Sequence, residues 1–203
     1  MDVSEVLRDQ DALRTEAEGA YRELRLDELL AGVGTPTIVG SAALGLMVRR
    51  DLDLDLDVAC ERLDDAAVAA VAAVGARLAT HPHVRLVTFR NDCGAWNREP
   101  DAYPDGLYLG VECVSSGAAW NLDVWFLDKP ERQPSTAHLT TLRPRLTDES
   151  RAAIINIKRA WADHPEYGTT VKSFDVYRAV LDDGVRDPAR FETWVGQRKK
   201  PQP

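Results

Sequence analysis

The chain has 203 residues, with 25 Lys and Arg against 33 Asp and Glu and a formal net charge of -8. Its hydrophobic fraction of 44% is sufficient for a core, which excludes an intrinsically disordered chain. The acid surplus argues against a protein that binds long nucleic acid, because neutralising phosphates requires clustered Lys and Arg.

The cysteines and the apolar runs bear on where the protein acts. Cys60, Cys93 and Cys113 form no CxxC pair and no zinc-ligand spacing, so we expect free thiols in a reducing compartment. No run of about 18 apolar residues is present to span a membrane, and the N-terminus lacks the order of a signal peptide. The expectation is a cytoplasmic protein with no membrane partner.

The first part of the chain predicts helices around two strands. Apolar residues at helical spacing predict a helix at the start of the chain, and a segment with Gly and Pro predicts its end. An Ala-rich run further on predicts another helix. The predicted elements are a helix over 3–30, a break at 32–36, a short strand over 37–40, a turn or short helix over 41–48, a strand over 50–58 and a helix over 61–80.

The later part predicts three strands and then helices. Thr147 and Asp148 can cap a helix, and Pro188 stands at a favoured first-turn position of another. The predicted elements are strands over 83–89, 107–114 and 120–127, irregular segments over 91–106 and 130–144, and helices over 148–163, 172–181 and from 188 onward. The simplest architecture is α+β: a mixed-sheet domain over residues 1–146, then a helical subdomain over 147–198.

The stretch from Asp51 to Val58 alternates strictly between aspartate and an apolar residue. Successive side chains of a strand point to opposite faces, so four aspartates share one face. Four like charges cannot enter a dry core unpaired, which predicts a face that is wet or neutralised by cations. Aspartate is a poor strand former, and its repeated use indicates oxygen ligands for a cation such as Mg²⁺.

A turn of small residues lies just upstream. Gly40 and Ser41 end a strand, and backbone N–H groups at such a turn can hold phosphate oxygens. Ser41 precedes Asp51 by ten residues, and Asp53 follows two residues later.

This order and spacing resemble the signature of the nucleotidyltransferase superfamily, which includes DNA polymerase beta-like enzymes and aminoglycoside and lincosamide nucleotidyltransferases. That signature is Gly-Ser, about ten residues, and then Asp-hydrophobic-Asp. A third carboxylate follows on a later strand, and Asp123 stands in the matching position, with Leu122, Val124 and Phe126 expected to face the core. A stretch near Ser173 also looks like one in small uncharacterised bacterial members.

The resemblance implies a nucleotidyltransferase-like mixed β-sheet flanked by helices, with a C-terminal helical subdomain. It also implies two Mg²⁺ ions, or Mn²⁺, held by Asp51, Asp53 and Asp123, which are the expected catalytic residues. The metal pair is either Asp51 with Asp53 or Asp53 with Asp55, because this chain has overlapping Asp-x-Asp pairs.

Further residues extend the expected site. Gly40, Ser41 and Lys158 are the expected nucleotide- and phosphate-binding residues, Lys158 because similar enzymes use a basic residue of the helical domain. Asp55, Asp175 and Tyr177 are the expected acceptor-pocket residues.

The implied activity is transfer of a nucleoside monophosphate from an NTP, ATP by default, to a hydroxyl of a small molecule or protein, with release of pyrophosphate. Two other classes stay open. One is a catalytically inactive, antitoxin-like module on the same fold that binds a nucleotide or a partner. The other is a metal-dependent phosphodiester hydrolase, which the four histidines disfavour because none lies near the aspartate strand.

Overall fold

A computed structural model describes residues 2–50, 54–100 and 103–198. Their five strands form one mixed sheet in the order β1-β2-β5-β4-β3. The β2–β5 pair is parallel and the other pairs are antiparallel. The strands are β1 (Thr35–Ile38), β2 (Leu54–Ala59), β3 (Val84–Asp92), β4 (Gly106–Ser115) and β5 (Ala118–Leu127).

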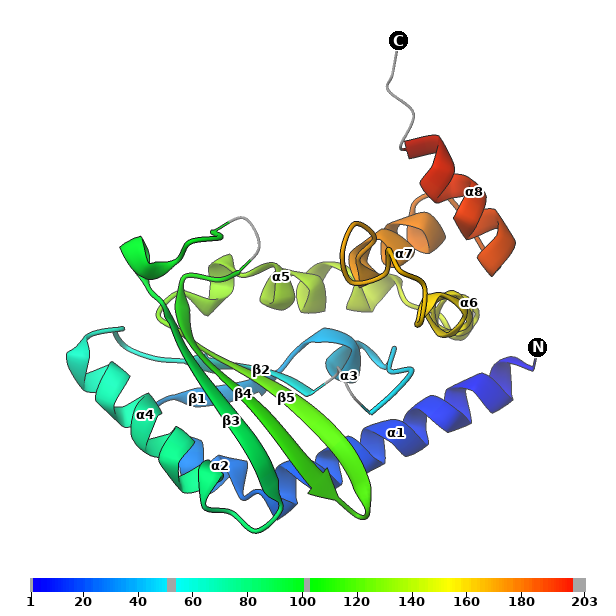
Figure 1. The fold of residues 1–203 in the computed structure, drawn as a ribbon. Helices are drawn as coiled ribbons and strands as arrows, with labels where there is room; N and C mark the ends of the chain where they lie inside the picture. Colours follow the sequence, from blue (N-terminus) through cyan, green and yellow to red (C-terminus); the bar gives the residue numbers. More distant parts are fainter. Residues whose placement is uncertain (1, 51–53, 101–102, 199–203) are drawn as a thin grey trace.

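Helices lie on both sides of this sheet (Figure 1). The α-helices are α1 (Val3–Glu23), α2 (Leu26–Leu30), α3 (Gly40–Leu44), α4 (Asp65–Ala79), α5 (Pro134–Thr141), α6 (Asp148–Trp161), α7 (Ser173–Leu181) and α8 (Pro188–Arg198). The 3₁₀ turns are η1 (Gly94–Trp96), η2 (Pro130–Arg132) and η3 (Arg143–Arg145). The expected fold class, a mixed sheet flanked by helices, is confirmed.

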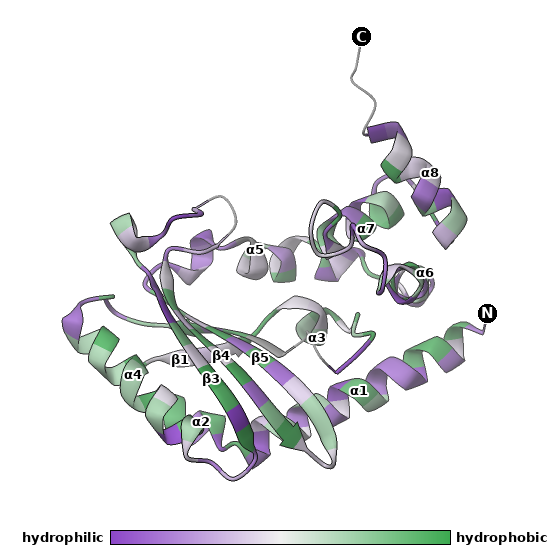
Figure 2. Ribbon diagram, viewed as in Figure 1, coloured by the Kyte–Doolittle hydropathy of each residue, from purple (hydrophilic) through white to green (hydrophobic). Residues whose placement is uncertain are grey.

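The sheet buries one face under α1, α2 and α4 (Figure 1). Hydrophobic and hydrophilic residues alternate along β4 and β5 (Figure 2), as a sheet with one covered face requires. Leu122, Val124 and Phe126 of β5 are buried in this core, as expected from the sequence. The other face, which carries Asp123, is the more accessible one.

A second hydrophobic core lies among α6, α7 and α8. It also takes in Val6 of α1 and Leu44 and Leu46 at the end of α3. The C-terminal helices therefore pack on the N-terminal part of the chain, and the boundary at residues 146 and 147 stays a prediction.

Local differences from the expected elements concern the first helix and α5. The first helix ends at Glu23, because Arg25 adopts a left-handed conformation with φ 52°, and α2 then starts a new direction. Helix α5 occupies a segment expected to be irregular.

No described helix combines the length and apolar content needed to cross a membrane.

Candidate functional site

A cleft of about 710 Å³ lies between the sheet and the C-terminal helices. This volume is within the range of roughly 300–1,000 Å³ typical of ligand pockets. Five of the residues expected from the sequence line it, although they come from four separate elements: Gly40, Ser41, Asp123, Lys158 and Tyr177.

Gly40 and Ser41 are the first two residues of α3, and with the N-cap residue Val39 they form the turn that follows β1. Gly40 has φ 63°, a left-handed conformation that glycine adopts without a side-chain clash. The amides of the first helical turn have no partner within a helix, and Val39 at the N-cap supplies no side-chain hydrogen bond to them. The buried Ser41 and these amides are therefore donors at the edge of the cleft.

Asp123 stands at the middle of β5, half-buried, on the accessible face of the sheet. The hydroxyl of Tyr108 on β4 donates a hydrogen bond of 2.5 Å to its Oδ1 atom. The parallel register sets Asp123 opposite Asp55 of β2. Neighbouring strands lie about 4.8 Å apart, so the backbones of these two aspartates are adjacent.

Asp51 and Asp53 lie outside the described residues, as does the side chain of Asp55. The choice between the two Asp-x-Asp pairs therefore stays open. Asp57, further along the strand, is buried, which differs from the expectation of a wet or cation-neutralised face. Hydroxyls of α5 replace water there: Ser135 donates to Asp57 Oδ2 at 2.6 Å and Thr136 at 3.4 Å. Burial raises the pKa of the Asp57 carboxyl above its ordinary value, and these two hydrogen bonds oppose the rise.

Lys158 of α6 is buried and lines the cleft. Its Nζ atom donates a hydrogen bond of 2.8 Å to the carbonyl of Leu46. Arg151, two turns earlier on α6, donates to the carbonyl of Gly45. Helix α6 thus holds the segment that connects the Gly40–Ser41 turn to the aspartate strand.

The same segment ends in two anchored arginines. Arg49 donates to the carbonyl of Ala162 at the end of α6. Arg50 pairs with Glu16 of α1, with an Nη2–Oε1 distance of 3.0 Å. The backbone is therefore fixed from both sides immediately before the aspartates begin.

Aromatic residues make up much of the helical side of the cleft. Tyr177 of α7 is buried there, and the Tyr167 hydroxyl lies 2.9 Å from Ser173 Oγ. The rings of His138 and Phe174 stack with centroids 4.6 Å apart. Burial lowers the pKa of the His138 imidazole below its ordinary value, so the ring is neutral at physiological pH.

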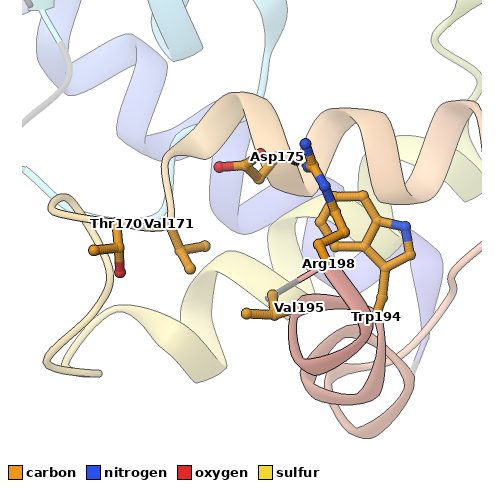
Figure 3. Close-up of a pocket in the computed structure, with 6 residues that line it drawn as sticks. All are labelled: Thr170, Val171, Asp175, Trp194, Val195 and Arg198. Atoms are coloured by element: carbon orange, nitrogen blue, oxygen red, sulfur yellow. Dashed lines mark hydrogen bonds and ion pairs between the residues drawn. The ribbon is translucent and has the colours of Figure 1, made fainter. Parts of the chain in front are cut away.

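Asp175 lies in a different hollow, of about 220 Å³, between α7 and α8 (Figure 3). Its Oδ2 atom accepts from the backbone N–H of Lys172 at 2.9 Å, which caps the start of α7. Its Oδ1 atom pairs with Arg198 at 2.9 Å, and the Arg198 guanidinium lies over the Trp194 ring. Of these two expected acceptor-pocket residues, Tyr177 therefore lines the cleft, whereas Asp175 lines the smaller hollow.

The carboxylate groups of the site suit Mg²⁺ as a ligand set. Carboxylate oxygens are the ligands that this ion prefers, and Asp123 presents one at the cleft in register with the aspartate strand. Among the residues that the structure describes, no group of three or more His, Cys, Asp or Glu side chains could hold a metal ion. The side chains of Asp51, Asp53 and Asp55 lie outside that described set, so the expected ligand set stays a prediction.

Sequence reasoning missed three contributors to the site. Tyr108 belongs to no motif, although its alternation with Leu107 and Leu109 places it on the accessible face. Ser135 and His138 belong to α5, for which the sequence carries no helical apolar stripe.

No protein-family model and no curated protein matches the chain. Solved structures resemble it. The Cid1 poly(U) polymerase with bound Mg and 3'-dATP matches over 88% of this chain and 52% of its own, at 18% identity and a TM-score of 0.58. A cytoplasmic RNA terminal U-transferase matches over 88% and 51%, at 17% identity and a TM-score of 0.56.

The c-di-GMP synthase CdnE of Capnocytophaga granulosa matches over 85% of this chain and 60% of its own, at 11% identity and a TM-score of 0.55. The chain thus spans about half to three-fifths of the length of these proteins. At such identities the likeness concerns the fold. The chain shares the fold of these nucleotidyltransferases, which is the fold expected from the resemblance.

Proposed function

We propose that the protein is a metal-dependent nucleotidyltransferase. It moves a nucleoside monophosphate from an NTP to a hydroxyl of a small molecule or protein and releases pyrophosphate. One observation carries the proposal: a single cleft, in a nucleotidyltransferase fold, is lined by the Gly40–Ser41 turn, Asp123 and Lys158.

The donors of the cleft suit the phosphate end of the nucleotide. The amides at Gly40 and Ser41 and the Ser41 hydroxyl bind oxygens of the leaving pyrophosphate. Lys158 adds a positive charge to the cleft, where its Nζ atom is oriented by the carbonyl of Leu46. Neutralising and positioning the phosphates supplies most of the rate in phosphoryl transfer generally.

The carboxylates of the cleft suit the metal ions and the attacking hydroxyl. Asp51, Asp53 and Asp123 would hold the metal ions, with Asp53 and Asp55 as the alternative pair. Bound Mg²⁺ supplies charge neutralisation on the phosphates and lowers the pKa of the attacking hydroxyl. Asp123 also accepts the proton of that hydroxyl, because its carboxylate lines the cleft.

The acceptor is proposed to be small or a protein side chain. The net charge of -8 disfavours a long polyanion. The poly(U) polymerase and the RNA U-transferase act on RNA by their names, so an RNA end belongs among the acceptors to be tested. ATP is the default donor.

The second candidate is a catalytically inactive, antitoxin-like module on the same fold that binds a nucleotide or a partner. An inactive descendant tends to lose one of its acidic residues, whereas this chain keeps aspartate at positions 51, 53 and 123. The active enzyme is therefore the better-supported proposal.

A thermal-shift titration with ATP, GTP, CTP and UTP, with and without Mg²⁺ or Mn²⁺, tests nucleotide binding. A ligand that binds only the folded state raises the melting temperature with concentration. No stabilisation by any of the four nucleotides with metal would contradict the enzyme proposal.

Pyrophosphate release then separates transfer from binding alone. The assay offers an aminoglycoside, a protein with exposed Ser and Tyr, and an RNA oligonucleotide as acceptors. Acceptor-dependent pyrophosphate release is expected with the first or second of these. Release only with RNA would correct the acceptor class, and stabilisation without release from any acceptor would favour the binding module.

A further inference from the structure

The accessible face of the sheet carries an ordered side-chain arrangement behind Asp123. Tyr108 and Gly110 are neighbours on this face of β4, and Gly110 is the register partner of Asp123 on β5. The Tyr108 ring leans along its strand toward Gly110 and donates its hydroxyl to Asp123 Oδ1 at 2.5 Å.

Gly110 leaves the space that this arrangement requires. A Cβ atom added at Gly110 would lie 2.6 Å from the Tyr108 hydroxyl and 3.1 Å from two ring carbons. Such distances are too short for a van der Waals contact. Any larger residue at position 110 would therefore push the tyrosine hydroxyl away from Asp123.

Cation–π and ring contacts hold the Tyr108 ring from its other side. The Arg90 guanidinium lies 4.5 Å from the Tyr108 centroid and 4.3 Å from the Tyr103 centroid. Arg90 pairs in register with Tyr108 and forms an ion pair with Asp92 at 3.0 Å. The Trp125 ring lies 4.9 Å from that of Tyr108. The ring is thus fixed by contacts independent of its hydroxyl.

We propose that Tyr108 is a positioning residue that orients the Asp123 carboxylate for metal binding, with Gly110 providing its space. The inference rests on the proposed function, because it takes Asp123 as a metal ligand. The hydroxyl holds Oδ1 and restricts the side-chain rotamer, so Asp123 would be oriented for the cation through Oδ2. Groups that orient a metal ligand in this way contribute about 10–100-fold to metal affinity.

The test is the affinity for Mn²⁺ in the presence of a non-hydrolysable ATP analogue, measured by EPR of the free ion. Tyr108→Phe removes the hydroxyl and keeps the ring, and we expect about tenfold weaker Mn²⁺ binding with an unchanged melting temperature. Tyr103→Phe is the matched control. It makes the same chemical change on the other tyrosine ring under Arg90.

Gly110→Ala is the second variant, because its added methyl displaces the Tyr108 hydroxyl. It is expected to weaken Mn²⁺ binding about as much as Tyr108→Phe. The double variant is expected to be no weaker than the more affected single variant, since both act through one hydrogen bond. Additive losses would overturn the role of Gly110.

Asp123→Asn separates the failure of this inference from the failure of the proposed function. If Asp123→Asn weakens Mn²⁺ binding while Tyr108→Phe matches wild type, the positioning role is overturned and the proposed function stands. If Tyr103→Phe weakens binding as much as Tyr108→Phe, the loss is a general disturbance of the cluster, and the role is again overturned. If Asp123→Asn leaves Mn²⁺ affinity unchanged, both proposals fail, because Tyr108 would have no metal ligand to orient.

Discussion

The two sides of the cleft differ in their chemistry. The sheet side presents the carboxylate of Asp123, next in register to the aspartate strand, whereas the helical side presents the ammonium of Lys158 and the aromatic residues Tyr177 and His138. A nucleoside triphosphate with bound Mg²⁺ has both a cation and anionic oxygens. Under the proposed function, each side would bind a different part of this one ligand.

The two sides also share a feature. Each charged group is oriented by a hydrogen bond from elsewhere in the chain, Asp123 by the Tyr108 hydroxyl and Lys158 by the Leu46 carbonyl. Both are therefore positioned before a ligand binds, and preorganisation of this kind reduces the entropy lost on binding.

The largest expected effect concerns the aspartates on the sheet side. Asp53 belongs to both candidate metal pairs, so Asp53→Asn should abolish metal-dependent ATP binding in an isothermal titration. Asp57→Asn should retain most of it, because Asp57 is engaged by Ser135 and Thr136. The reverse outcome would refute the assignment. Comparing Asp51→Asn with Asp55→Asn in the same titration decides which residue completes the pair.

On the helical side, Lys158→Met should weaken the binding of Mg²⁺–ATP about tenfold or more. The substitution keeps the apolar stem and removes a charge-assisted hydrogen bond, which is worth about 1.5–3 kcal/mol. Arg159→Met is the matched control, because Arg159 is the next residue on α6 and pairs with Asp9 instead. Equal losses in the two variants would show that Lys158 acts only through overall charge.

A smaller effect is expected from pH. The pKa of His138 is lowered in the folded state, so the unfolded chain binds a proton more readily. The stability that the neutral ring contributes is complete above about pH 6.5 and is lost as the pH falls below it. Between pH 7.5 and 5.5, the melting temperature of wild type should fall further than that of His138→Phe, which keeps a ring against Phe174. Parallel pH profiles would contradict this prediction.

The smallest effect is expected outside the cleft. Asp175→Asn should lower the free energy of unfolding by about 0.2–1 kcal/mol, measured by urea denaturation, because it removes the ion pair with Arg198. It should leave ATP affinity unchanged, whereas Tyr177→Ala should reduce it. A loss of ATP affinity in Asp175→Asn would contradict the division between the two hollows.

Much of the fold could be predicted, because it depends on local patterns. Alternation identified β4 and β5, and Thr147 begins α6 with the expected cap, accepting from the Ser150 N–H at 3.3 Å. Helix α5 could not be predicted, since Pro134–Thr141 has no apolar stripe. It is tied to β2 instead by side-chain hydrogen bonds to Asp57, a contact between distant segments.

The proximity of the candidate residues could be predicted where a motif marked them. Gly40, Ser41 and Asp123 do meet at one cleft, because they lie at the end of β1 and on β5 of one sheet. Asp175 and Tyr177 are two residues apart, and residues so spaced on a helix face different sides. Tyr108 could not be paired with Asp123 without the β4–β5 register, which no local pattern reveals.

The most direct test of the central claim is a titration of Asp123→Asn and wild type with ATP in the presence and absence of Mg²⁺. The account predicts that Mg²⁺ strengthens ATP binding to wild type at least tenfold, and that Asp123→Asn loses this enhancement while retaining its fold by circular dichroism. An unchanged Mg²⁺ enhancement in Asp123→Asn would contradict it.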